Sequence, residues 1–317
     1  MSVLFIGSWQ RGNAKDEAER TQWLKVLQQA MPDEDWVEQV TAGQEAQIEV
    51  AVVANPPHGS LLNLPKLRLI QSLWAGVDKL LTDTSLPAEV PLARMVDPAM
   101  NEAMVQTALW AVLALHRGFY DVQRQQQQAL WQAPAQCRAH EWRVLMLGLG
   151  ELGGRVAGTL AGLGYAVSGW STRSASIDGV RTGSGEGELA RMLAEADTVI
   201  NLLPLTDQTR GFFAAARFAA MKRGGTLVNL ARGAHVVEAD LLVALDSGQL
   251  SRAVLDVFSV EPLPAAHPFW AHPRVTVLPH TAAQTDPRSA AEAVKANLAA
   301  LREGLPLAHL VARKRGY

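Results

Sequence analysis

One stretch, residues 143–173, constrains the fold of this chain more than any other. It opens with a short apolar run, residues 144–147, and three glycines at the GxGxxG spacing follow: Gly148, Gly150 and Gly153. Residues 155–164 then read as a helix and residues 165–170 as a second strand. A strand, a glycine turn, a helix and another strand make most of a dinucleotide-binding βαβ unit.

Each part of the glycine turn has a predicted role in holding a dinucleotide. Gly148 allows the tight turn, Gly150 lets the backbone approach a pyrophosphate, and Gly153 lets the helix pack close to the strand. The helix N-terminus then presents backbone N–H groups and a partial positive charge to the phosphates, and Glu151 and Leu152 of the turn are further predicted coenzyme contacts. Because glycines also form ordinary tight turns, the flanking strands strengthen this interpretation.

Composition bounds the class of protein. A chain of 317 residues is long enough for two domains, and 48% hydrophobic with 19% charged residues is ordinary for a globular protein. A formal net charge of −2 gives no electrostatic reason to expect nucleic acid or an anionic membrane as partner. With Cys137 as the only cysteine, a disulfide within the chain and a cysteine metal cluster are excluded. No metal site is predicted, and we expect a cytoplasmic protein without a membrane span.

Apolar runs of strand length alternate with helical segments along the chain, which predicts an α/β fold with parallel sheets. The predicted strands are residues 3–6, 48–54, 67–73, 92–96, 144–147, 165–170, 198–204, 225–230, 253–258 and 275–278. The principal predicted helices are residues 16–31, 101–117, 155–164, 238–247 and 289–303, and the second of these is apolar on nearly all sides, as a buried helix would be.

Ligands of open α/β sheets bind at the carboxyl ends of the strands, where this chain places Arg232, Glu261 and His280. A guanidinium can hold a carboxylate by two parallel hydrogen bonds. An imidazole can protonate a developing alkoxide, and a neighbouring carboxylate favours its charged form. With a nicotinamide supplying hydride, this is the minimal set for reducing a 2-keto acid. Each residue also has a structural alternative: a surface ion pair for Arg232, a strand end for Glu261 and a loop histidine for His280.

Several motifs together resemble those of one enzyme family over nearly the whole chain. They are WAGVD at 74–78, GLGELG at 148–153, NLLPLTDQT at 201–209, NLARG at 229–233, LDVFSVEPLP at 255–264 and LPH at 278–280. The chain resembles the D-isomer-specific 2-hydroxyacid dehydrogenases. The run NLARGAHVVEADLLVALDSG and the ending RGY are similar to the glyoxylate/hydroxypyruvate reductase A branch in particular.

The resemblance implies two Rossmann-like domains. A doubly wound, NAD(P)-binding domain spans residues 98–285. A discontinuous, flavodoxin-like substrate (catalytic) domain combines residues 1–97 with residues 286–317. In this family pattern Arg232 takes the substrate clamp, Glu261 the histidine partner and His280 the acid/base role.

The resemblance also implies further contacts. Asp256 and the Ala231 carbonyl would hold the nicotinamide amide, and Leu203 and Pro204 would flank the adenine. The other implied coenzyme contacts are Thr209 and Ala282, and the implied substrate-binding residues are Trp74, Ala75, Gly76 and Val77. Family members are usually homodimers, with the helix from Asn101 and the arm at Trp131 in the interface.

The end of the second strand of the coenzyme domain predicts which dinucleotide binds. NAD-using members carry an acid there for the ribose hydroxyls, whereas this chain has Trp170, Ser171, Thr172 and Arg173. No carboxylate is present to repel a 2′-phosphate, and Arg173 can pair with one. We therefore predict NADP(H) in preference to NAD(H), which stays possible; the alternative is an exposed loop cation.

The predicted function is NADPH-dependent reduction of small 2-keto acids, glyoxylate to glycolate and hydroxypyruvate to D-glycerate. One alternative is an NADH enzyme or one for larger substrates such as phenylpyruvate, for which Trp74 could offer an aromatic face. A remote alternative is a nucleotide-sensing binding protein without catalysis. The three chemically complementary residues at the strand ends favour the enzyme.

Overall fold

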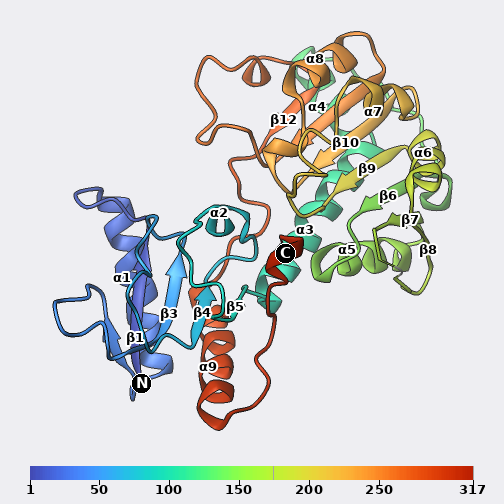
Figure 1. The fold of residues 1–317 in the computed structure, drawn as a ribbon. Coiled ribbons are helices and arrows are strands. Elements are labelled where there is room, and N and C mark those ends of the chain that lie inside the picture. Colours follow the sequence, from blue (N-terminus) through green and yellow to red (C-terminus); the bar gives the residue numbers. More distant parts are fainter. Residues whose placement is uncertain (174, 317) are drawn as a thin grey trace. The chain divides into compact units, whose positions relative to one another are not determined.

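A computed structural model describes residues 1–173 and 175–316 of the chain (Figure 1). The chain divides into two compact units. The first comprises Met1–Met100 and Thr285–Tyr317, and the second is Asn101–Gln284. Each unit contains its own parallel sheet, and the predicted α/β class is confirmed.

The first unit is built on a sheet with the strand order β2-β1-β3-β4-β5. All its neighbouring strands are parallel, and the order is that of flavodoxin-like folds. The strands are β1 Ser2–Gly7, β2 Asp35–Val37, β3 Ile48–Ala54, β4 Leu69–Ser72 and β5 Leu92–Ala93. The helical elements are α1 Ala14–Ala30, α2 Asp78–Leu81, α9 Pro287–Glu303 and the 3₁₀ turn η4 Arg313–Arg315.

Alternating side chains of this sheet enter two separate cores. One set packs against α1 and α9, and includes Phe5 and Val52. The other packs against α2 and the loops before it, and includes Leu4 and Val53. This alternation follows from the two-residue period of a strand. A buried amide pair also ties α9 to β4, since Asn297 Nδ2 donates to Gln71 Oε1 at 2.7 Å.

The second unit contains a sheet with the strand order β12-β11-β10-β9-β6-β7-β8. Read outward from β6, this is the doubly wound order of dinucleotide-binding folds with one additional strand. The strands are β6 Arg143–Leu147, β7 Ala166–Trp170, β8 Val180–Gly183, β9 Thr198–Asn201, β10 Gly225–Asn229, β11 Leu250–Leu255 and β12 Val275–Val277. The helical elements are α3 Pro98–His116, whose residues 98–100 belong to the first unit, α4 Phe119–Gln127, η1 Ala139–Glu141, α5 Glu151–Gly162, α6 Glu186–Glu195, α7 Ala215–Ala220, η2 Gly233–His235, α8 Glu238–Asp246 and η3 Pro268–Trp270.

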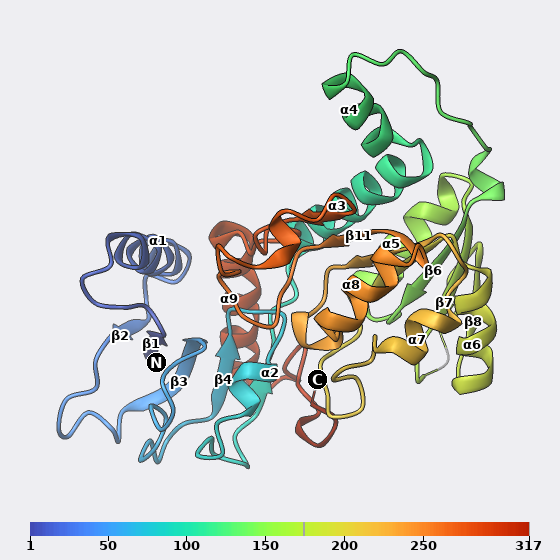
Figure 2. The ribbon, with the colours of Figure 1, turned by 90° about the horizontal axis from the view of Figure 1, so that it is seen from above.

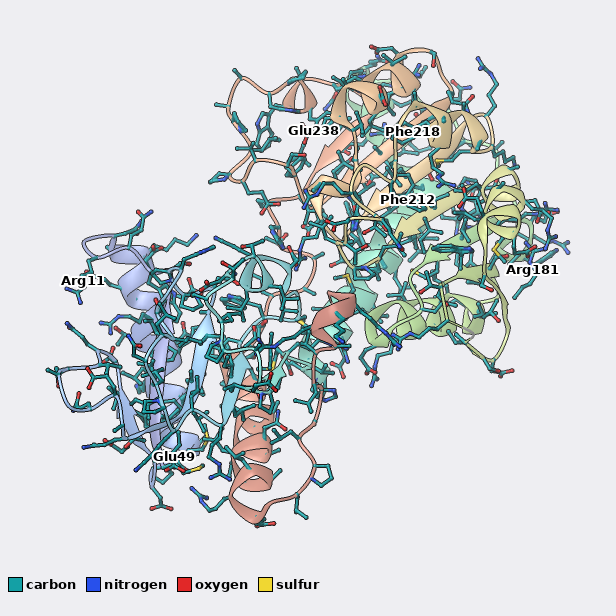
Figure 3. All side chains as sticks on the ribbon, viewed as in Figure 1. Arg11, Glu49, Arg181, Phe212, Phe218 and Glu238 are labelled. Atoms are coloured by element: carbon teal, nitrogen blue, oxygen red, sulfur yellow. The ribbon has the colours of Figure 1, made fainter. Side chains whose placement is uncertain are left out.

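Helices cover both faces of this second sheet. One core joins α3 and α5 to side chains such as Met146 and Ile200. The opposite core joins α6, α7 and α8 to side chains such as Leu145 and Val199. Phe218 of α7 is fully buried there, whereas Arg181 of β8 is exposed and pairs with Glu195 at 3.0 Å (Figure 3). The sheet is therefore enclosed on its faces, and its strand ends stay available for ligands.

Two helices begin at Asp–Pro sequences. Asp286 caps α9 by accepting from Arg288 N–H at 2.9 Å, and Asp97 accepts from the N–H of Ala99 at 3.1 Å. Proline suits the first helical position because its ring fixes φ and its missing N–H has no partner to lose there. The helix α3 consequently begins at Pro98, before the predicted residue 101. It is also less buried than predicted, since Trp110 is 43% exposed. No helix in residues 1–173 or 175–316 is long and apolar enough to cross a membrane.

Candidate active site

The glycine turn lies between β6 and α5, where the strand order of the second sheet reverses. Gly148 has φ +91°, and a Cβ there would lie 2.6 Å from the carbonyl oxygen of Leu202. A Cβ on Gly153 would lie 1.8 Å from the carbonyl oxygen of Gly148. These two glycines are therefore required by the protein's own backbone. Gly150 differs, because a Cβ there would meet nothing within 4 Å.

The open side of Gly150 coincides with the start of α5. Gly150 is the N-cap residue and has no side chain with which to cap the helix. Glu151 begins the helix and accepts bonds from Arg155 at 2.8 Å and from Asn101 at 3.2 Å. The first-turn N–H groups of a helix have no intrahelical partner and carry a partial positive charge. Open space beside such a helix end fits a phosphate group.

The segment after β7 lies beside this turn, because β7 pairs with β6. Trp170 ends the strand and donates through its indole N–H to the Gly185 carbonyl at 2.9 Å. The Ser171 hydroxyl donates to the Arg173 carbonyl, and Thr172 and Arg173 are exposed. Residue 174 lies outside the described residues. The acid typical of NAD-binding relatives is absent from residues 171–173, which the structure describes.

The loop after β9 borders the glycine turn on its other side. Leu203 is buried, and its N–H donates to Asn201 Oδ1 at 3.2 Å. The Pro204 carbonyl accepts from the Thr209 hydroxyl at 2.7 Å. The predicted adenine-side residues therefore belong to one ordered loop.

The loop after β10 carries Arg232. Its guanidinium donates to the Ala231 carbonyl at 2.7 Å, and its own carbonyl accepts from Asn229 Nδ2 at 3.0 Å. A Cβ on the next residue, Gly233, would lie 1.9 Å from the carbonyl carbon of Phe258. Only glycine allows this approach, which brings the arginine loop against the segment that leads from β11 to Glu261.

Glu261 and His280 form a hydrogen-bonded pair. The distance from His280 Nδ1 to Glu261 Oε2 is 2.7 Å, and the Phe258 N–H fixes the other carboxylate oxygen at 2.9 Å. This bond to Glu261 raises the pKa of His280. Burial works to raise the pKa of Glu261, but the bonds from His280 and Phe258 hold that pKa below its ordinary value. The positive charge of Arg232 acts on both groups, which places the three side chains in one electrostatic environment.

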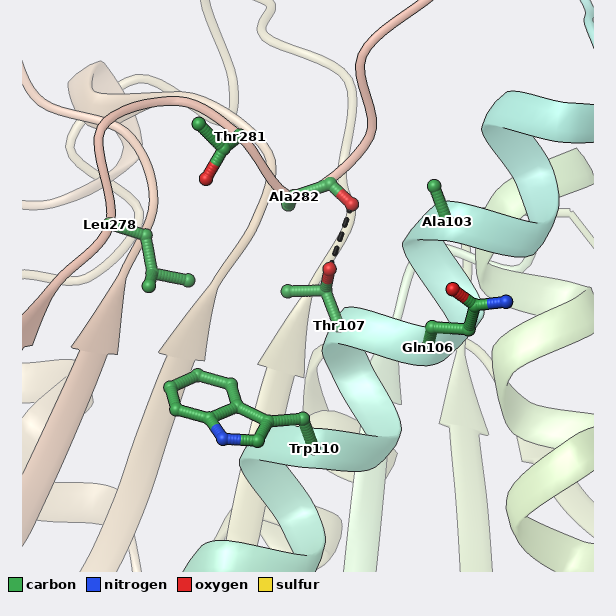
Figure 4. A pocket seen from close by; sticks show the side chains of 7 residues that line it. All are labelled: Ala103, Gln106, Thr107, Trp110, Leu278, Thr281 and Ala282. Carbon is green, nitrogen blue, oxygen red and sulfur yellow. Dashed lines mark hydrogen bonds between the residues drawn. The ribbon is translucent and has the colours of Figure 1, made fainter.

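The segment that carries His280 is anchored on two sides. The buried carboxylate of Asp256 accepts from the N–H groups of Thr281 at 2.7 Å and Ala282 at 3.1 Å, and its backbone carbonyl accepts from the His280 N–H at 2.9 Å. The Ala282 carbonyl in turn accepts from the Thr107 hydroxyl of α3 at 2.8 Å, beside a hollow lined by Trp110 (Figure 4). These anchors hold the backbone of His280 at φ +53°.

Asp256 itself is an unusual carboxyl group. Its burial raises its pKa, although the bonds from Thr281 and Ala282 act in the opposite direction. The two groups predicted to bind the nicotinamide amide are the Asp256 carboxylate and the Ala231 carbonyl. Both already have partners, since the Ala231 carbonyl also accepts from Arg232. A carbonyl or carboxylate oxygen has two lone pairs, so each can accept a further bond.

The predicted substrate-binding segment, Trp74–Val77, lies in the first unit just after β4. Trp74 is anchored at both backbone groups: its N–H donates to Ser72 Oγ at 3.0 Å, and its carbonyl accepts from the Met95 N–H at 3.1 Å. Its ring meets Trp23 edge to face at 6.0 Å. Val77 is buried and precedes α2. The segment is thus well ordered within its own unit.

Three residues near the site were missed by sequence reasoning. Asn201 and Asn229 end neighbouring strands and lie in register with one another, and His235 follows in η2. All three are fully buried. Paired asparagines at the ends of two adjacent apolar strands were an available signal, because a buried amide needs specific partners.

Comparison with known proteins agrees with this geometry. Residues 109–282 match the NAD binding domain of the D-isomer specific 2-hydroxyacid dehydrogenases. The chain belongs to this family of oxidoreductases. Within the family it falls in the glyoxylate/hydroxypyruvate reductase A branch, as its motifs predicted.

Individual relatives match over almost the whole chain. A glyoxylate/hydroxypyruvate reductase A of Serratia proteamaculans is 42% identical over 93% of this chain and 96% of its own. A family member of Xanthobacter autotrophicus, solved with NADPH and MES, is 37% identical with a TM-score of 0.91 over 100% of this chain and 99% of its own. An NADPH-dependent glyoxylate/hydroxypyruvate reductase of Sinorhizobium meliloti, solved with NADP and sulfate, is 33% identical with a TM-score of 0.90 over 100% of both chains.

Proposed function

We propose that this protein reduces small 2-keto acids with NADPH, converting glyoxylate to glycolate and hydroxypyruvate to D-glycerate. The observation that carries the proposal is the His280–Glu261 pair, 2.7 Å apart, in the field of Arg232 at the strand ends of a dinucleotide-binding sheet. The names of similar proteins from Serratia and Sinorhizobium support the same substrates. The setting we propose is the cytoplasm.

The proposed roles follow from the chemistry of each side chain. Arg232 binds the substrate carboxylate, for which its planar fork of donors is suited. His280, as an imidazolium, donates its proton to the keto oxygen while Glu261 orients the ring. Bound NADPH supplies the hydride that the keto carbon accepts. Hydride and proton together convert the C=O group to an alcohol, and His280 is left neutral.

The residues present fit such a coenzyme. The open space at Gly150 and the N-terminus of α5 suit the pyrophosphate. Arg173 suits a 2′-phosphate, and residues 171–173 include no carboxylate that would repel one. The complexes of similar proteins with NADPH and NADP support this preference. The assignments of Ala231, Asp256, Leu203 and Pro204 to coenzyme contact, and of 74–77 to substrate contact, stay predictions.

The coenzyme preference is tested by the variant Arg173→Ala. Losing a charge-assisted contact of about 1.5–3 kcal/mol lowers kcat/KM with NADPH roughly 10- to 100-fold and leaves NADH kinetics almost unchanged. Arg181→Ala is the matched control, because Arg181 is an exposed arginine of β8 paired with Glu195. Equal NADPH kinetics in both variants would show that Arg173 does not select the coenzyme.

We also propose that the protein is a homodimer formed through the second unit. The helix α4 buries none of its side chains, and it projects from the rest of that unit together with the segment leading to β6 (Figure 2). This segment contains Trp131, whose side chain is fully exposed, and further exposed apolar residues are Trp110, Leu113, Phe119, Val122 and Leu130. A surface of this kind marks an interaction site, and the family resemblance names a second copy as its occupant.

The reaction is tested by mixing the protein with NADPH and either glyoxylate or hydroxypyruvate and following the loss of reduced-nicotinamide absorbance. His280→Ala should lower turnover roughly 10²- to 10⁴-fold, as the loss of a general acid would, while NADPH still binds. His272→Ala is the control, since His272 pairs with Asp246 away from these residues. Oxidation of NADH alone, or of NADPH with only bulky 2-keto acids, would favour the alternative reductases, and no oxidation at all would favour a binding protein.

A further inference from the structure

Three fully buried polar side chains, Asn201, Asn229 and His235, lie beneath the loops that follow β9 and β10. They are hydrogen-bonded to one another. Asn201 Nδ2 lies 2.9 Å from Asn229 Oδ1 and 3.0 Å from His235 Nδ1. The proposed reaction assigns none of them a role.

The backbone fixes the direction of every bond among these residues. Asn201 Oδ1 accepts from the Leu203 N–H, so its Nδ2 must face Asn229 and His235. Asn229 Oδ1 also accepts from the Ala231 N–H at 3.3 Å, and its Nδ2 donates to the Arg232 carbonyl at 3.0 Å. Since an amide nitrogen only donates, the two asparagines form a chain of bonds with one direction.

This chain fixes the protonation state of His235. Its Nδ1 faces the Asn201 NH₂ group, which can only donate, so Nδ1 must accept and carries no proton. The proton therefore sits on Nε2, which lies 3.3 Å from the Pro204 carbonyl. The neutral Nε2–H form is the one that bonds at both nitrogens.

The outer bonds described above end on two loops of the proposed site. On one side they reach Leu203 and Pro204, and on the other Ala231 and Arg232. A buried polar group that loses its hydrogen-bond partner destabilises the conformation in which it is left unpaired. The network therefore strongly disfavours any movement of either loop that separates it from the amides.

We propose that Asn201, Asn229 and His235 are positioning residues that hold the Arg232 loop in its carboxylate-binding conformation and join it to the Leu203–Pro204 loop. The proposal rests on the proposed function of Arg232 in binding the keto acid. It deepens that function by naming what orients the arginine. His235 serves as the neutral Nε2–H tautomer that bridges the two loops.

Asn229→Asp tests the bonds that join the network to the Arg232 loop. The substitution keeps the shape and both accepted bonds, but it places a carboxylate oxygen opposite the Arg232 carbonyl. We expect the KM for glyoxylate to rise roughly tenfold or more, because small displacements of binding groups are costly. This factor should exceed the factor by which the Kd for NADPH rises. The control is Asn297→Asp, the same change at a buried asparagine of the first unit, which should lower thermal stability without raising KM.

Two substitutions of His235 separate its two bonds. Asparagine can place an acceptor where Nδ1 lies, and glutamine can place a donor where Nε2 lies. His235→Gln should therefore lose the bond to Asn201 and raise the KM for the keto acid. His235→Asn should lose the bond to Pro204 and weaken NADPH binding instead. Identical effects of the two variants on both constants would overturn the bridging role.

A double-mutant cycle shows whether Asn229 acts through Arg232. If it does, the fold-rise in KM of the double variant Asn229→Asp/Arg232→Lys is smaller than the product of the two single fold-rises. A fold-rise equal to that product would overturn the proposal. Hydrogen exchange at the His235 amide, which donates to the Arg232 carbonyl at 3.3 Å, gives a readout independent of activity. Exchange that is faster in Asn229→Asp than in Asn297→Asp supports the network, and equal exchange overturns it. Failure of the wild type to oxidise NADPH would instead refute the proposed reaction, and the exchange result would still decide the network.

Discussion

Replacing Glu261 by glutamine isolates the contribution of its charge to the pKa of His280, the proposed proton donor. Glutamine at this position keeps the shape of the side chain and can still accept from the Phe258 N–H. The wild-type bond to Glu261 raises the pKa of His280, so the imidazolium persists to higher pH. In the proposed reaction, reduction requires the His280 imidazolium and declines as pH rises through that pKa. Without the carboxylate, the decline should begin at lower pH.

The size of the effect follows from the geometry of the pair. A hydrogen bond to a charged group contributes about 1.5–3 kcal/mol, and the 2.7 Å distance from Nδ1 to Oε2 is short. The His280 side chain is 52% exposed, so solvent screening reduces the contribution to about 1.4 kcal/mol. That is roughly a factor of ten in the ratio of imidazolium to imidazole. On the alkaline side of the profile, kcat/KM should therefore fall about tenfold.

The assay is kcat/KM for glyoxylate with NADPH as a function of pH for the wild type, Glu261→Gln and Glu238→Gln. The last is the matched control, because Glu238 faces another histidine, His267, at 3.3 Å. We expect the alkaline limb to move to lower pH only in Glu261→Gln, with a smaller loss at acid pH. An unmoved limb in that variant, or the same movement in the control, would refute the reasoning.

Three other predictions concern different parts of the second unit. Gly150→Ala should leave the melting temperature of the free protein unchanged but weaken NADPH binding in a fluorescence titration. In Gly153→Ala the new Cβ would lie 1.8 Å from a carbonyl oxygen. This variant should lose about 1–3 kcal/mol of folding stability, which lowers the melting temperature by roughly 2–4 °C for each kcal/mol. Burial raises the pKa of Asp256, so its contribution to stability is lost as pH rises through its folded pKa. Asp256→Asn has no such loss. The melting temperature of the variant relative to that of the wild type should therefore rise as pH increases across the acid range. Trp131→Glu should convert a dimer to monomers by light scattering, and an unchanged mass would refute the proposed interface.

The main strands were predictable because apolar runs of strand length leave few alternatives. The edge strands β2 and β8 were missed, since the sequence VRTG of β8 is polar and contains glycine and so lacks the pattern of a buried strand. The helix α5 was predicted from residue 155 although it begins at Glu151. Gly153 and Gly154 conceal its first turn, because glycine has low helix propensity and tertiary packing overrides that preference here.

Parts of the candidate site were predictable because chemically distinctive residues follow strand ends. Arg232, Glu261 and His280 were identified in this way, and the structure brings them into one environment. No role was predicted for His235. Its environment depends on Asn201, 34 residues away in sequence, and on amide orientations that no local pattern encodes.

The aligned asparagines of β9 and β10 also bear on how the second sheet forms. Asn201 and Asn229 are register partners in two parallel strands whose other residues are mostly apolar and all buried. Apolar side chains tolerate a shifted pairing better than amides do. A shift of one residue turns one asparagine to the opposite face and leaves two amides buried without each other, at about 1–3 kcal/mol for each unsatisfied group. During folding, the asparagine pair would thus disfavour pairing of β9 and β10 in a shifted register before any coenzyme binds.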